Sequence, residues 1–363
     1  MNQLHRSQSA AGQVVKPLSV FGLAMVLGIG QAHAAEATKS PASHPPCKQE
    51  YTVKYQVFPG SLLNIVPSVA AARGIFKDNC VRGVAVPVNS APAAFAQSVQ
   101  GSVNMVLTAP DNVIRARANG LDVVIFANMF SRNIYSFVVS SKYKDLAGKP
   151  FKDIMNALRG KKIGVTVLGG SNEYFARSNF DAAELDPGSA TYVALGTSAN
   201  FLAALSQGTV DAVQAFGNTQ DIAVAMGLGF IANDTRIPPS ATNPVPEAGL
   251  RLKATTGWAA QAKYMDENKA AVKAFAKANS EAIEWISNKA NRPQLYQILQ
   301  KEVPMPEDIP NRDVVLKKSI DIFADQVSDS LRPEDIGEWL KFAEKFYKLE
   351  KTVELDKLVR KID

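Results

Sequence analysis

The pattern of apolar and polar positions repeats itself along the chain. Two stretches match when one is shifted by 107 positions, the first starting at Ser90 and the second at Thr197. They read SAPAAFAQSVQGSVNMVLTAP and TSANFLAALSQGTVDAVQAFG. Each copy is typical of a helix, a tight glycine turn, a short strand, a loop and a second helix, followed by a turn and a strand. Internal similarity of this kind predicts one supersecondary unit that the fold uses twice.

The two units also match upstream of these stretches. YQVFPGSLLNIV and VTVLGGSNEYFA both read as a strand, a glycine-serine turn and a helix, so Gly60 and Ser61 correspond to Gly170 and Ser171. A β-α-β-α-β order with short strands predicts a mostly parallel sheet with helices on both faces. The expected fold class is therefore α/β with two such lobes.

The pattern changes in the last third of the chain. The stretch ATTGWAAQA, around Trp258, is predicted to cross back from the second lobe to the first. From Asp266 onward, apolar residues recur at spacings of three and four, which predicts helices that pack on the first lobe. The expected boundaries are 51–136 for the first part of lobe 1, 137–250 for lobe 2 and 251–363 for the completion of lobe 1.

The N-terminus has the features of an export signal. Arg6 and Lys16 precede the apolar run LSVFGLAMVLGI, and Ala32-His33-Ala34 fits a small-x-small cleavage site. This run is shorter than the about 20 apolar residues that a membrane-spanning helix needs, which favours a signal peptide over an uncleaved anchor. We expect residues 1–34 to be a signal peptide cleaved near Ala34, residues 35–50 to be a flexible leader, and the mature protein to be periplasmic.

Composition narrows the chemistry of the mature chain. After residue 34 it carries 38 basic and 34 acidic residues without a basic block, so nucleic acid is not an expected partner. All three histidines precede residue 45, which excludes histidine-based catalysis and histidine-ligated metals from the folded body. No cofactor or metal is expected. Cys47 and Cys80 suit a disulfide in an exported protein, with two free thiols as the alternative.

The loops at the carboxyl ends of the strands are predicted to face one cleft between the lobes, because ligands bind α/β sheets there. Four helix starts in these loops carry a hydroxyl side chain. Backbone N–H groups at a helix start can hold an anion, although each hydroxyl also suits an ordinary N-cap. The candidate ligand-binding residues in these loops are Gly60, Ser61, Ser90, Thr108, Ala109, Gly170, Ser171, Asn172, Thr197, Ser198, Phe216 and Asn218.

Charged and aromatic residues supply further candidates. Arg132 lies where lobe 1 passes to lobe 2 and is either a ligand-binding arginine, holding a carboxylate or sulfonate through its planar fork, or a solvated hinge residue. Glu173 suits the start of a helix but would favour a ligand amine if it faced the cleft. Asp111 is ambiguous in the same way. The aromatic residues preferred for stacking on a ligand are Phe216 and Trp258, ahead of Phe58 and Tyr174.

The chain resembles the periplasmic solute-binding proteins of ABC importers for sulfonates, taurine and nitrate, with thiamine-precursor-binding proteins as near relatives. The resemblance rests on AAARGIFKD (70–78), LSQGTVDAV (205–213) and KYMDENKAAVKAFAKANSEAIEWI (263–286), and it covers about Tyr51 to Leu349. Asn104 departs from the family, which often has Asp at that turn. The resemblance implies the two-lobed type II fold and a monomeric protein that closes on a small molecule and delivers it to a membrane permease.

Three functions remain to be distinguished. The leading hypothesis is a binding protein for a small organic anion, such as a sulfonate, a taurine-like compound or an aromatic carboxylate. A pyrimidine, a thiamine precursor or another neutral heterocycle is the alternative ligand. A pyrimidine-precursor synthase is the enzymatic rival, and it is disfavoured because such enzymes carry a cysteine-rich motif and use histidine. We therefore expect a protein that is not an enzyme.

Overall fold

The computed structural model describes residues 47–240, 243 and 252–362, which belong to one compact unit. The predicted signal peptide, its cleavage site near Ala34 and most of the predicted leader lie outside the described residues. Within the described part, no helix combines the length and the apolar character that crossing a membrane requires.

The sheet of lobe 1 is assembled from two pieces. β1 pairs with β2 in parallel, and β10 lies antiparallel between β3 and β4. A parallel bridge between Tyr55 and Met105 joins the pieces, which gives the order β2-β1-β3-β10-β4. The strands are β1 Tyr51–Val57, β2 Val81–Pro87, β3 Val106–Thr108, β4 Val123–Phe130 and β10 Thr256–Gln261.

The five-stranded sheet of lobe 2 has the corresponding order, β7-β6-β8-β5-β9. β6 runs parallel to β7 and β8, whereas β5 runs antiparallel to β8 and β9. In each lobe the antiparallel strand in fourth place is the one that enters from the other lobe. The strands are β5 Tyr135–Ser140, β6 Lys162–Val165, β7 Thr191–Ala194, β8 Ala212–Phe216 and β9 Gly229–Asp234.

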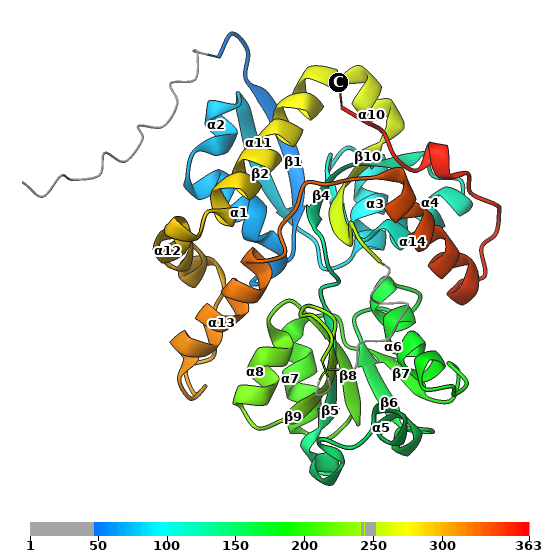
Figure 1. Cartoon of the computed structure of the whole chain (residues 1–363). Helices are drawn as coiled ribbons and strands as arrows, with labels where there is room; N and C mark the ends of the chain where they lie inside the picture. Colours follow the sequence, from blue (N-terminus) through cyan, green and yellow to red (C-terminus); the bar gives the residue numbers. More distant parts are fainter. Residues whose placement is uncertain (1–46, 241–242, 244–251, 363) are drawn as a thin grey trace, which may run out of the picture. The chain divides into compact units, whose positions relative to one another are not determined.

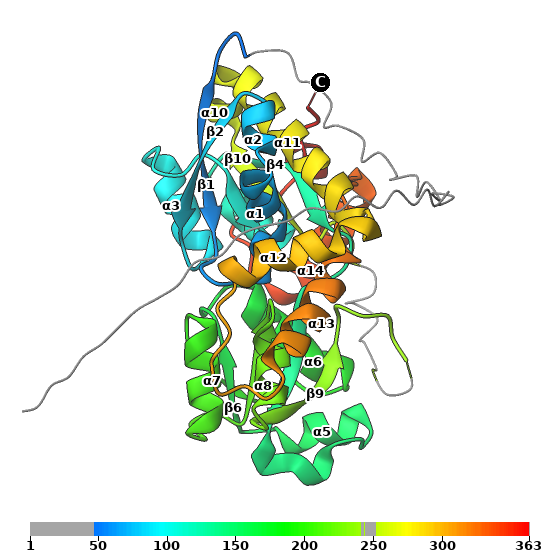
Figure 2. The ribbon, with the colours of Figure 1, turned by 90° about the vertical axis from the view of Figure 1, so that its left-hand side faces the viewer.

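Helices flank both sheets, as Figures 1 and 2 show. In lobe 1 they are η1 Leu62–Asn64, α1 Ile65–Ala72, α2 Ile75–Asp78, α3 Ala91–Val99 and α4 Pro110–Ala118. In lobe 2 they are η2 Ser141–Leu146, α5 Phe151–Ala157, α6 Ser171–Ala182, α7 Ser198–Ser206 and α8 Thr219–Ala225. α3 begins at residue 91 and α7 at residue 198, so the structure reproduces the shift of 107 positions. The predicted repeat is confirmed.

The C-terminal helices contact more than lobe 1. α11 packs on α1 and β4, and α12 packs on α1, as predicted. By contrast, α13 contacts α8 of lobe 2, and α14 contacts both α4 of lobe 1 and α6 of lobe 2. The C-terminal elements are α10 Ala262–Glu267, α11 Lys269–Ser287, η3 Lys289–Asn291, α12 Arg292–Glu302, α13 Arg312–Ala324, α14 Pro333–Phe346 and η4 Leu355–Lys357.

A disulfide ties the start of the described chain to lobe 1. Cys47 is bonded to Cys80, with their Cα atoms 5.5 Å apart, which confirms the predicted pairing. The backbone N–H of Tyr51 donates to the carbonyl of Cys80 at 2.8 Å, immediately before β1 and β2 begin to pair. The bond therefore joins the starts of two neighbouring parallel strands.

Candidate ligand-binding site

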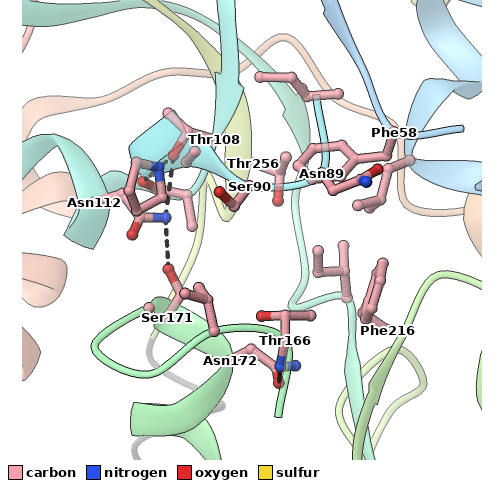
Figure 3. A pocket seen from close by; sticks show the side chains of 18 of the residues that line it. Phe58, Asn89, Ser90, Thr108, Asn112, Thr166, Ser171, Asn172, Phe216 and Thr256 are labelled. Atoms are coloured by element: carbon pink, nitrogen blue, oxygen red, sulfur yellow. Dashed lines mark hydrogen bonds between the residues drawn. The ribbon is translucent and has the colours of Figure 1, made fainter. Parts of the chain in front are cut away.

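Two adjoining cavities lie between the lobes. The first cavity has a volume of about 60 Å³ and is lined by strand ends and helix starts of both lobes (Figure 3). The second cavity has a volume of about 330 Å³ and shares Phe58, Asn89 and Phe216 with the first. Among the described residues, no charged side chain lines either cavity. A ligand in them would therefore contact hydroxyl, amide, aromatic and backbone groups.

Three helix starts meet at the first cavity. Ser90 is the N-cap of α3, and its hydroxyl accepts a hydrogen bond from the N–H of Ala93 at 3.4 Å. Ala109 is the N-cap of α4 and Gly170 is the N-cap of α6. The first N–H groups of a helix have no acceptor inside it, and the helix dipole places partial positive charge at the same end. The first cavity therefore lies at the positive ends of helices from both lobes.

The two glycines before α6 are required by the shape of its first turn. Gly169 has a φ of +74°, in the left-handed region that favours glycine. A Cβ atom at Gly170 would lie 2.7 Å from Cγ1 of Val167, which is too close. The carboxylate of Glu173 accepts from the N–H of Gly169 at 2.6 Å and pairs with Arg177 at 2.6 Å. Glu173 thus stabilises the helix start and lies outside both cavities.

Ser171 joins the two lobes. Its hydroxyl donates to Oδ1 of Asp111 at 2.8 Å. It also accepts from Nδ2 of Asn112 at 2.7 Å, as Figure 3 shows. The same Nδ2 atom donates to the hydroxyl of Thr108 at 3.2 Å. Behind these residues, the hydroxyl of Tyr347 donates to the other carboxylate oxygen of Asp111. The start of α6 in lobe 2 is therefore bonded to the start of α4 in lobe 1, so the lobes are closed in this structure.

Asp111 is fully buried and lies behind the cavity lining. Burial raises the pKa of its carboxyl, and the hydrogen bonds from Tyr347 and Ser171 oppose that rise. Burial likewise raises the pKa of the Tyr347 hydroxyl, and the charge of Asp111 raises it further. Asp111 thus anchors the contact between the lobes, and ligand in the first cavity would meet Ser171 and Asn112 instead.

The predicted candidates divide between the cavities. Of the four hydroxyl-bearing helix starts, Ser90 and Ser171 lie at the first cavity, and Ser61 and Thr197 lie at the second. The four helix starts therefore lie at two adjoining cavities, and their common role in binding one ligand stays a prediction. The first cavity also has Thr108, Ala109, Gly170 and Asn172, the second has Gly60, Ser198 and Asn218, and Phe216 lines both.

Trp258 and Arg132 lie away from both cavities. The indole of Trp258 is buried in the core of lobe 1, where its N–H donates to Oδ1 of Asn279 at 2.8 Å and its ring contacts Phe275. Among the residues of β10, only Thr256, at the start of the strand, lines the first cavity. Arg132 donates from Nε to a backbone carbonyl at 3.1 Å and lines a separate surface hollow. These contacts favour a surface arginine near the hinge over a ligand-binding arginine.

Several lining residues were not among the preferred candidates. They include Phe58, Asn89, Asn112, Tyr135, Thr166 and Thr256. Phe58, Asn89 and Thr166 directly follow or nearly follow a strand, so the rule about carboxyl ends would have found them. Asn112 gave no such signal. Its Oδ1 atom is buried without a hydrogen-bond partner among the described residues.

The two α/β lobes, each completed by a strand from the other half of the chain, define the class of fold to which this protein belongs. It is the periplasmic binding protein fold, which solved structures with the same architecture share. The family model described as NMT1/THI5 like matches residues 65–292, more than half of the chain. The protein therefore belongs to the NMT1/THI5-like family. A comparison with curated protein sequences finds no match.

Solved structures of sulfonate- and nitrate-binding proteins are similar to this chain. The alkanesulfonate-binding protein SsuA from Xanthomonas axonopodis pv. citri, bound to MOPS, is 16% identical with a TM-score of 0.68, covering 88% of this chain and 100% of the other. The periplasmic aliphatic sulphonate binding protein SsuA from Escherichia coli is 18% identical with a TM-score of 0.65, covering 87% of this chain and 94% of the other. The periplasmic nitrate-binding protein NrtA from Synechocystis PCC 6803 is 19% identical with a TM-score of 0.58, covering 73% of this chain and 70% of the other.

Proposed function

We propose that this protein is an extracytoplasmic substrate-binding protein that captures a small organic anion between its lobes and delivers it to the permease of an ABC importer. The observation that carries the proposal is the meeting of α3, α4 and α6 at a cavity without a charged side chain among its described lining residues. Proteins named for sulfonate and nitrate binding share the fold. The proposed action is binding without chemical turnover.

Helix starts favour a negative charge in the first cavity. Each contributes about 0.3–1 kcal/mol to an exposed anion and up to about 2 kcal/mol to a partly buried one. The N–H groups of Ser171 and Asn172, in the first turn of α6, have no acceptor within the helix. No acidic side chain is among the described lining residues, and the carboxyl of Asp111 lies behind Ser171.

Closure of the lobes would couple binding to recognition by the permease. The bonds from Ser171 to Asp111 and Asn112 exist only when α6 approaches α4. A ligand that contacts both lobes stabilises the closed state by its difference in affinity for the closed and open states. We propose that the permease recognises this closed form.

One observation favours the second candidate, a neutral heterocycle. The buried Oδ1 atom of Asn112 needs a donor, and a sulfonate or nitrate has none to offer. A pyrimidine with an amino or ring N–H group has one. Phe58 and Phe216 would flank such a ring.

Thermal unfolding of the purified protein distinguishes the two. Alkanesulfonates, taurine, nitrate, aromatic carboxylates and pyrimidines are added separately, each at about 100 times its dissociation constant, where a ligand adds about 2.7 kcal/mol of stability. We expect anions to raise the midpoint and to be recovered unchanged. A shift with pyrimidines and none with anions would replace the proposed ligand by the heterocycle, and conversion of any ligand to a product would overturn the binding-only function.

A further inference from the structure

The second cavity is larger than the first and opens beside it. Its volume is about 330 Å³, against about 60 Å³ for the first cavity. Phe58 and Asn89 of lobe 1 and Phe216 of lobe 2 line both, so these three residues stand at the junction. Figure 3 shows Phe58 and Asn89 on one side of the gap and Phe216 on the other. A molecule that occupied both cavities would therefore contact these three residues.

The lining of the second cavity is mainly apolar. Most of its side chains are apolar, namely those of Phe58, Pro59, Ala199, Leu202, Phe216, Ile222, Pro304 and Pro306. This composition favours hydrocarbon, because burying apolar surface is favourable in proportion to its area.

Three polar side chains of the second cavity have partners within the protein. The hydroxyl of Ser61 accepts from the N–H of Leu63 at 3.3 Å, and the hydroxyl of Ser198 accepts from Thr219 at 2.7 Å. The amide of Asn218 faces the sulfur of a methionine at 3.8 Å. These three groups are therefore less available to a polar ligand group, whereas Thr197 at the start of α7 makes no side-chain capping bond.

Three separate parts of the chain form the walls of this cavity. Lobe 1 contributes the loop after β1, lobe 2 contributes the start of α7 and the turn after β8, and the segment between α12 and α13 contributes two prolines. Lobe closure brings the first two walls together, so a hydrocarbon group held between them is removed from water as the lobes close.

We propose that the second cavity binds the apolar body of the same ligand whose anionic head occupies the first cavity. The inference rests on the proposed function and specifies its substrate class. The ligand is an amphiphilic organic anion, with a compact charged head and an alkyl or aryl body of several carbon atoms. Affinity then rises about fourfold for each methylene that enters the second cavity, until the cavity is filled.

Linear alkanesulfonates from methanesulfonate to octanesulfonate test the proposal by isothermal titration calorimetry. Ala199→Phe fills the second cavity from the exposed first turn of α7. Ala203→Phe is the matched control, because it places the same side chain at an exposed position one turn later in α7, outside both cavities. We expect wild type and Ala203→Phe to gain about fourfold in affinity per methylene, and Ala199→Phe to lose that gain while binding methanesulfonate as wild type does.

Other outcomes would overturn the proposal in distinguishable ways. Equal affinity of wild type for short and long sulfonates would show that the second cavity takes no hydrocarbon, while the proposed anion-binding function would stand. A chain-length gain that survives Ala199→Phe would place the hydrocarbon elsewhere. If no alkanesulfonate of the series bound, the first cavity would not hold the anionic head on which the inference depends, and the proposed function would fail with it.

Discussion

Replacing Tyr347 by phenylalanine removes one hydroxyl from the buried contact between the lobes. That hydroxyl donates to Asp111 at the start of α4, and the Tyr347 ring lies against Tyr174 of α6 with centroids 3.7 Å apart. The substitution keeps the ring and its packing. It therefore tests the hydrogen bond to a buried carboxyl and little else.

The size of the expected loss depends on the charge of Asp111. A hydrogen bond to a neutral group contributes about 0.5–1.5 kcal/mol, and one to a charged group about 1.5–3 kcal/mol. Burial holds the folded-state pKa of Asp111 above its unfolded value, so the contribution of Asp111 to stability is complete below the unfolded pKa and is lost as pH rises through the folded pKa. The hydrogen bond from the Tyr347 hydroxyl lowers the pKa of Asp111. Removing that bond therefore raises the folded-state pKa of Asp111 further.

We therefore expect Tyr347→Phe to lower the free energy of unfolding more at pH 8 than at pH 4, by about 1 kcal/mol where the Asp111 carboxyl is protonated and by about 1.5–3 kcal/mol where it is ionised. Urea unfolding followed by tryptophan fluorescence measures both values. Tyr143→Phe is the matched control, since Tyr143 donates to the partly exposed Asp211 at 2.9 Å, and we expect it to cost less than about 1 kcal/mol. Equal losses for the two variants at both pH values would refute a buried, titrating Asp111 at the lobe contact.

Three further predictions concern other parts of the fold. Replacing Cys47 and Cys80 by serine should cost about 3.7 kcal/mol, from the loop of 33 residues that the disulfide closes, and reduction of wild type should cost the same in a denaturant titration. Arg236→Met should cost about 3–5 kcal/mol in the same assay, because it leaves two buried carboxylates without their cation. Trp258→Phe should cost about 1–3 kcal/mol through a lost buried hydrogen bond but leave ligand affinity unchanged, and a fall in affinity at constant stability would contradict its place in the core.

Local sequence rules predict the repeated unit and the turns that begin the helices. The order of strands, glycine turns and helices depends on neighbouring residues, so the pattern at Ser90 and Thr197 is enough to reveal it. The same holds for the glycines before Ser171, where a left-handed turn needs glycine. The disulfide followed from the export signal and the cysteine count.

Contacts between distant residues explain where sequence reasoning fell short. Trp258 follows Thr256 by only two residues in β10. Thr256 lines the first cavity, whereas Trp258 lies in the core of lobe 1. Tyr347 reaches Asp111 across 236 positions of sequence, and no local pattern encodes that pairing. The two adjoining cavities likewise depend on residues from separate lobes, since Phe58 and Phe216 line both.

The bonds of Ser171 decide how the turn at the start of α6 can hold a ligand. Its hydroxyl already donates to Asp111 and accepts from Asn112, so replacing it affects lobe closure before it affects any ligand contact. The groups left to an anion are the backbone N–H groups of the first turn, which every residue type except proline supplies. In the proposed function, helix starts would recognise charge in the first cavity, with no lysine or arginine among its described lining residues. Discrimination among anions would then depend on the shape and apolar character of the second cavity, which is why the chain-length series and the Ala199→Phe variant test the proposed substrate class more directly than a substitution at Ser171.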